Sequence, residues 1–215
     1  MKRSLLLIVL ATIIVSGCAS HQLANREMLT RFDPIMDQPQ IKTFYQERFK
    51  ETFVSYEASE VRLVSALFES QSLLLLPITI FNKTNNAIMP ADYSVALYDG
   101  RDMKQIKMLT RDDLLDVKAK LQGRPSDGNI ETKVINSVMD SLTFMTGDPD
   151  KQLVMQGLDL ALYDYFSFRP IYPHEKRYGI LCFILDFKAE YPITLNVRVG
   201  AKNHEIRFLP KPPKT

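Results

Sequence analysis

The stretch Leu73-Leu74-Leu75-Leu76-Pro77-Ile78-Thr79-Ile80-Phe81 lies in the middle of the chain and is followed by Asn82-Lys83-Thr84-Asn85-Asn86. An apolar run of this length, bounded by an Asn-rich turn, is typical of a strand buried in a sheet. Pro77 has no N–H to donate to a neighbouring strand, so it predicts a bulge or a place at the sheet edge. The strands that pair with this run have to be found in the sequence before and after it.

Further strands are expected on both sides of this run. Apolar residues alternate or cluster over short stretches that end in turn residues, which is the pattern of strands in a sandwich. Asp99-Gly100 in addition predicts a hairpin turn. The expected strands are Val61 to Phe68, Asp92 to Tyr98, Ile106 to Leu109, Tyr178 to Phe187, Ile193 to Val199 and Glu205 to Leu209.

Residues 110–166 are expected to form helices inserted between strands. Thr110 is a suitable N-cap, and the acids Asp112 and Asp113 fall in the first turn, where the helix dipole favours them. One helix runs to Gln122, a second starts near Ile130, and a third runs from about Asp150 towards Phe166. The third presents Leu153, Val154, Leu158, Ala161, Leu162 and Tyr165 on one face.

This arrangement resembles the immunoglobulin-like domains of bacterial envelope proteins. Residues Ile78 to Thr84, Ser94 to Gly100 and Leu109 to Leu115 carry the resemblance. It implies an α+β fold, namely an immunoglobulin-like antiparallel β-sandwich with a helical insertion between strands, and it transfers no function.

Residues 40–56 are expected to form a short helix. The aromatic residues Tyr45, Phe49, Phe53 and Tyr56 are spaced by four, four and three residues, which places them on one helical face. Such a stripe is usually packed on a core, and the alternative is an aromatic contact face for a partner.

The start of the chain has the parts of a secretory signal peptide. Lys2 and Arg3 precede an apolar run from Leu5 to Val15, and small residues follow. The run is too short to span a bilayer, which takes about 20 apolar residues in a helix. The site Val15-Ser16-Gly17-Cys18 resembles a bacterial lipobox. The resemblance implies cleavage after residue 17 and acylation of Cys18; the alternative is a plain secreted protein.

The resemblance also implies where the protein resides. Ala19 stands where an aspartate would favour the inner membrane, so the expected location is the outer membrane, facing the periplasm. The expected organisation is a signal peptide at 1–17, the lipidated cysteine and a tether at 18–37, the β-sandwich domain at 38–209 and a Pro/Lys tail at 210–215.

The charge of the expected mature chain is balanced. Removing residues 1–17 takes away two basic and no acidic side chains, leaving 25 of each. A balanced charge gives no electrostatic reason to expect nucleic acid as a partner. With Cys18 acylated, only Cys182 is left, so no intramolecular disulfide is expected. Its apolar neighbours predict that Cys182 is buried and inert.

The sequence carries no recognisable catalytic, cofactor or metal motif. His174-Glu175 and His204-Glu205 begin like a zinc motif, but Tyr178 and Phe208 stand where the second histidine is needed. We therefore expect no catalytic residues, no metal and no cofactor.

One loop is a candidate contact surface for a partner. Residues 169–178 are rich in arginine, tyrosine and histidine, and arginine and tyrosine are enriched at interface hot spots. An ordinary solvated loop is the alternative. The candidate contact residues are Arg169, Tyr172, His174, Arg177 and Tyr178.

Three functions remain open from the sequence. The first is a membrane-anchored, non-enzymatic envelope lipoprotein that acts as a protein-interaction or assembly component, with another envelope protein as partner. The second is a periplasm-facing lipoprotein that binds a small ligand or lipid. The third is a hydrolase without a recognisable motif. A cavity of roughly several hundred Å³ with convergent polar groups would favour the second or the third, and a filled core with an exposed apolar patch the first.

Overall fold

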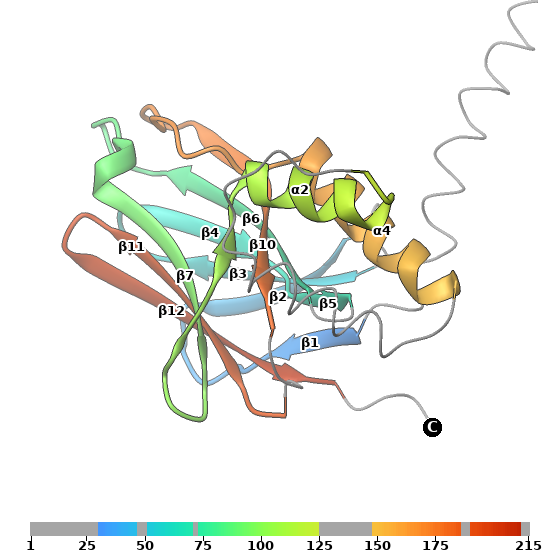
Figure 1. Ribbon diagram of the computed structural model, residues 1–215. Helices are drawn as coiled ribbons and strands as arrows, with labels where there is room; N and C mark the ends of the chain where they lie inside the picture. The colour runs from blue at the N-terminus through green and yellow to red at the C-terminus, as the bar shows by residue number, and fades with distance from the viewer. Residues whose placement is uncertain (1–29, 47–50, 71–72, 125–147, 186–189, 212–215) are drawn as a thin grey trace, which may run out of the picture.

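The computed structural model describes residues 30–46, 51–70, 73–124, 148–185 and 190–211 (Figure 1). These residues are mainly β-structure with two α-helices. The strands are β1 (Thr30–Pro34), β2 (Ile41–Gln46), β3 (Glu51–Glu57), β4 (Val61–Ser65), β5 (Phe68–Ser70), β6 (Leu73–Asn82), β7 (Tyr93–Asp99), β8 (Gln105–Ile106), β9 (Met108–Leu109), β10 (Lys176–Ile184), β11 (Ile193–Val199) and β12 (Lys202–Pro210). The helices are α2 (Arg111–Leu121), α4 (Asp148–Tyr163) and the 3-10 turn η2 (Pro90–Asp92).

The strands form two antiparallel sheets, an architecture consistent with a β-sandwich. One sheet contains β2, β3, β4, β5, β6, β10 and β9, and the other contains β12, β11, β7 and β8. Strand β1 belongs to both, because it pairs with β5 on one side and with β12 on the other. The expectation of an antiparallel two-sheet fold is therefore confirmed.

The central run of the sequence is buried on both faces of its sheet. In β6, Leu74, Leu76, Ile78 and Ile80 point into the cluster between the two sheets. Leu73 and Leu75 point the other way, into a second cluster under the helices. A strand covered on both faces needs apolar residues at every position, which explains why this run does not alternate.

Strand β10 follows the same rule and pairs with β6 along its whole length. Leu181 and Phe183 enter the cluster between the sheets, while Ile180 and Cys182 enter the cluster under the helices. Cys182 is fully buried, which confirms the prediction for this residue. Burial raises the pKa of its thiol to about 12, so it is an inert core residue.

The helices form an outer layer on the β6–β10 sheet (Figure 1). Thr110 caps α2 as predicted: its Oγ1 accepts from the Asp113 N–H, and the Asp113 carboxylate accepts from the Thr110 N–H. Lys118 of α2 forms an ion pair with Asp159 of α4. Val154, Leu158 and Ala161 of α4 are buried, as predicted. The helix expected from about Ile130 lies outside the described residues.

The helix expected at 40–56 is wrong. The described residues of this stretch form the antiparallel hairpin strands β2 and β3, with Tyr45 opposite Thr52. Tyr45 is 57% exposed although the helical reading placed it on the buried face, and Val54 is fully buried instead. Packing of β3 against β4 and of Val54 in the core outweighs the aromatic spacing.

Pro77 lies in an interior strand, so an edge location is wrong. On one side β6 pairs with β10, with Pro77 opposite Ile180. On the other side, β4 pairs with residues 78–82 and β5 with residues 73–75, so Pro77 falls at the break between them. This break takes the place of the predicted bulge.

The domain begins earlier than the sequence suggests. Residues 30–34 of the expected tether form β1, and Phe32 is buried in the core. At the other end, β12 extends to Pro210, the first residue of the expected tail. Within the described residues, no helix is long and apolar enough to cross a membrane.

Candidate functional site

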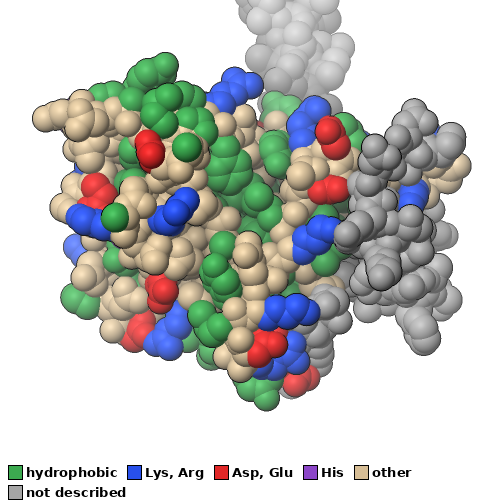
Figure 2. Space-filling view, turned by 60° about the vertical axis from the view of Figure 1, so that its left-hand side comes forward, with side chains coloured by type: hydrophobic (Ala, Val, Ile, Leu, Met, Phe, Trp, Pro, Cys, Tyr) green, Lys and Arg blue, Asp and Glu red, His purple; other side chains and the backbone are tan. Residues whose placement is uncertain are grey.

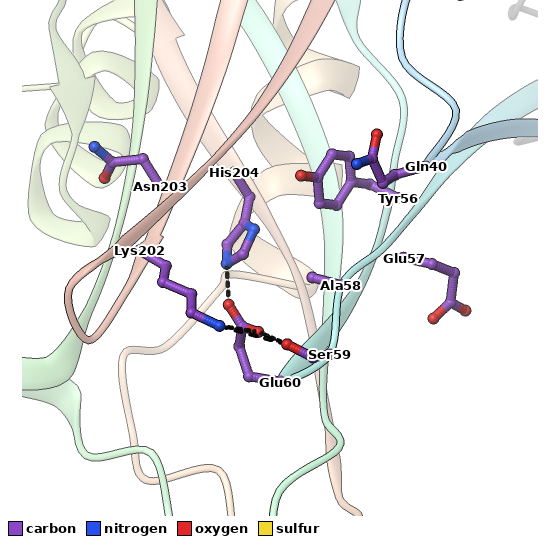
Figure 3. Close-up of a pocket in the computed structure, with 9 residues that line it drawn as sticks. All are labelled: Gln40, Tyr56, Glu57, Ala58, Ser59, Glu60, Lys202, Asn203 and His204. Atoms are coloured by element: carbon purple, nitrogen blue, oxygen red, sulfur yellow. Dashed lines mark hydrogen bonds and ion pairs between the residues drawn. The ribbon is translucent and has the colours of Figure 1, made fainter.

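A polar hollow lies at one end of the sandwich, where the two sheets meet (Figure 3). Its volume is about 520 Å³ and it is open to solvent. The end of β3 and the turn into β4 form one side, and the start of β12 forms the other. The lining residues are Gln40, Tyr56, Glu57, Ala58, Ser59, Glu60, Lys202, Asn203 and His204.

Glu60 and His204 form the centre of this hollow. Nε2 of His204 lies 3.1 Å from Oε1 of Glu60, and the histidine is only 3% exposed. Both atoms are buried and face each other, and among the described residues neither has a hydrogen-bond partner of good geometry. The second carboxylate oxygen, Oε2, accepts from Lys202 Nζ at 2.9 Å and from Ser59 Oγ. Figure 3 shows His204 and Lys202 both turned towards Glu60.

Their surroundings set the charges of the pair. Burial alone would raise the pKa of Glu60, but the hydrogen bonds from Ser59 and Lys202 together lower it to about 2. Burial lowers the pKa of His204, and the attraction of Glu60 offsets this only in part. Near neutral pH, Glu60 is therefore an anion, and a neutral His204 lies beside it with Nε2 facing Oε1.

This cluster holds the two sheets together. Glu60 lies in the turn that joins β3 and β4 of one sheet, and both Lys202 and His204 lie in β12 of the other. The Ser59 hydroxyl donates to Glu60 and not to His204. In a catalytic triad the nucleophilic hydroxyl bonds to the histidine, so these three residues do not have that arrangement. No group of three or more histidine, cysteine, aspartate or glutamate side chains in the described ranges is placed to hold a metal ion.

The pair makes stability depend on pH. As pH falls below about 6.5, unfolded His204 takes up a proton more readily than the folded form, so the free energy of unfolding falls. It falls again between about 4.5 and 2 as Glu60 is protonated. In urea denaturation between pH 7.5 and pH 5, replacing His204 with glutamine is expected to flatten this dependence.

The matched control for this experiment is His174→Gln. His174 is exposed, so this variant should keep the wild-type pH dependence. Identical pH profiles for the wild type and His204→Gln would mean that the pair does not control acid stability.

The loop predicted to contact a partner leads into the start of strand β10. Arg169, Tyr172, His174 and Tyr178 are exposed, and Arg177 is half-buried with Nη2 donating to the Pro170 carbonyl at 2.9 Å. Tyr93 donates its hydroxyl to the Arg169 carbonyl at 2.8 Å. These residues share one loop and the strand after it.

A buried asparagine anchors this loop. Asn82 Nδ2 donates to the carbonyls of Asn86 and Ile171, at 2.7 and 2.9 Å. Its Oδ1 accepts from the N–H and hydroxyl of Thr84. Two backbone bonds between Ile88 and Ile171 complete the connection. The loop is therefore held on the domain and presents Tyr172 and His174 to solvent.

Sequence reasoning missed the Glu60–His204 pair. Glu60 lies in the turn between β3 and β4 and His204 in strand β12, far apart in the chain, and His204 drew notice only as the start of an incomplete zinc motif. Cys18, the predicted lipidation site, lies outside the described residues. On the face shown in Figure 2, charged side chains of both signs are interspersed, with hydrophobic ones between them.

No known protein family, no curated protein and no solved structure compared with this chain matches it.

Proposed function

We propose that this protein is a membrane-anchored, non-enzymatic envelope lipoprotein that acts as a protein-interaction or assembly component. The observation that carries the proposal is the apolar outer surface of the helical layer. Leu115 of α2 is 42% exposed, and Leu160 and Tyr163 of α4 are 37% and 87% exposed. We call these three residues the helix-layer surface.

The core beneath the helix-layer surface is filled by other residues of the same helices. Leu114 and Leu158, on the inner sides of the same two helices, are fully buried and fill the cluster against the sheet. Apolar side chains exposed on the outer sides of two helices that are joined by an ion pair suit contact with another protein.

A lipid-binding role has less support. The apolar clusters are built from closely buried side chains, and the hollow at Glu60 is open and mainly polar. An acyl chain requires an enclosed apolar cavity.

The remaining parts of the proposal come from the sequence. The lipobox-like site supports acylation of Cys18 and an outer-membrane location facing the periplasm. The antiparallel two-sheet architecture supports an immunoglobulin-like sandwich. The exposed loop residues Tyr172 and His174 offer a second contact surface.

Site-specific crosslinking tests the proposed function. A photoreactive amino acid at Tyr163, in the full chain in its native membrane, is expected to capture another envelope protein. The same probe at Asn85, an exposed turn residue outside the helices, is the control and should capture far less. Equal capture at both positions, or none at Tyr163, would contradict a role for this surface.

The anchor has its own test. Replacing Cys18 with alanine is expected to leave an unprocessed or soluble precursor, because the acylated residue is lost. Detergent-phase partitioning of the wild type and the variant measures this. If both partition equally into the detergent phase, Cys18 is not the anchor.

A further inference from the structure

Strand β2 is an edge strand with unpaired backbone groups. It pairs with β3 on one side through residues 41–46, and no other described strand pairs with it. An open edge of this kind can accept a further strand.

The register shows which backbone groups point outward. Glu57 donates its N–H to the Gln40 carbonyl at 3.1 Å, so Gln40 faces β3. Orientation alternates along a strand, so Lys42 and Phe44 also face β3, while Ile41, Thr43 and Tyr45 point away. The Ile41 N–H is used by the Gln38 carbonyl at 3.1 Å. Among the described residues, the backbone groups left without a partner are therefore the N–H and carbonyl of Thr43 and of Tyr45, and the carbonyl of Ile41.

Little in β2 protects this edge. Proteins usually block open edges with proline, bulges, several charges or very short strands. Strand β2 has no proline, its pairing with β3 is continuous, and Lys42 is its only charged residue. By contrast, the edge strand β8 of the other sheet has only two residues.

We propose that β2 pairs with β2 of a second copy of this chain, antiparallel and centred on Thr43. The two Thr43 residues then exchange N–H and carbonyl bonds, and each Tyr45 N–H donates to the Ile41 carbonyl of the second copy. This register uses all three outward-facing residues of the strand, and it forms a symmetric interface in which the same surface serves both copies.

The side chains of β2 match this register. Lys42 lies opposite Phe44 of the second copy, where the ammonium group can contact the face of a 37% exposed ring. Thr43 lies opposite Thr43, a favourable cross-strand pair. A shift that centres the pairing on residue 42 would instead place two Lys42 side chains directly opposite each other, which is unfavourable.

Cysteine crosslinking tests the interface and its register. In the full chain in its membrane, Thr43→Cys is expected to give a covalent homodimer on oxidation, because directly opposed residues lie within disulfide reach. Tyr45→Cys is the matched control. In this register the two Tyr45 positions are about 13 Å apart along the strands, too far for a disulfide. Cys182 is buried, and the unsubstituted chain measures any contribution of Cys18.

A second measurement uses the backbone donor of Thr43. Thr43→Pro removes an outward N–H and leaves the bonds to β3 intact, so light scattering in mild detergent should give a monomer, while Thr43→Ala stays a dimer. The proposal is overturned if Thr43→Cys gives no homodimer, if Tyr45→Cys crosslinks equally well, if the adduct contains a different protein, or if Thr43→Pro remains dimeric.

Discussion

Replacing Leu158 with aspartate is expected to destabilise the domain severely. Leu158 is fully buried in α4, in the cluster formed by the two helices and the outer faces of β6 and β10. The described residues of this cluster are apolar, so a carboxylate there would have no partner. An unpaired buried charge destabilises a protein by about 4 kcal/mol or more, against a total stability of about 5–15 kcal/mol.

The control for this prediction is on the same helix. Leu160→Asp introduces the same charge two residues later, at a position that is 37% exposed, and is expected to change stability by less than about 1 kcal/mol. Urea denaturation followed by circular dichroism compares the variants. Equal stability of Leu158→Asp and the wild type would show that α4 does not pack on the sheet as described.

Replacing Gly179 with alanine is the other change with a large expected effect. A Cβ at this position would lie 2.4 Å from the Phe166 Cα and 2.7 Å from the Phe166 nitrogen. These are backbone atoms and cannot rotate away. The Phe166 N–H donates to the Ile180 carbonyl at 3.1 Å, and the Ile180 N–H donates to the Asp164 carbonyl at 2.7 Å, so the two segments are held together.

One methyl group should therefore force β10 and the segment after α4 apart, with a loss of about 3 kcal/mol. Lys176→Ala, at an exposed position of the same strand, is the control and should melt like the wild type. The melting temperatures of the three proteins, measured by circular dichroism, check this. A Gly179→Ala variant as stable as the control would mean that Phe166 does not cross β10 so closely.

The sequence predicted the central strands because burial on two faces leaves a local signal. The apolar runs of β6 and β10, and the Thr110 cap of α2, follow from short-range patterns. The β2–β3 hairpin did not, because Glu47-Arg48-Phe49-Lys50 contains none of the usual turn residues and the aromatic spacing mimics a helix.

The candidate site was harder to predict than the fold. Glu60 and His204 meet only because the β3–β4 turn and the start of β12 lie at the same end of the sandwich. No spacing rule connects residues brought together by the pairing of sheets. The sequence also could not predict that Leu115, Leu160 and Tyr163 are exposed, because apolar helix residues can equally face the core.

The place of β1 between the two sheets has a consequence for the order of folding. Phe32 pairs with Pro210 and Pro34 with Phe208, so the first described strand bonds to the last. During synthesis, which proceeds from the N-terminus, β1 has to wait for β12 before this contact can form. Contacts between distant parts of a chain form slowly. Until residue 210 has emerged, the two sheets cannot be joined by strand pairing through β1, and the nascent chain exposes apolar surface that a chaperone would have to shield.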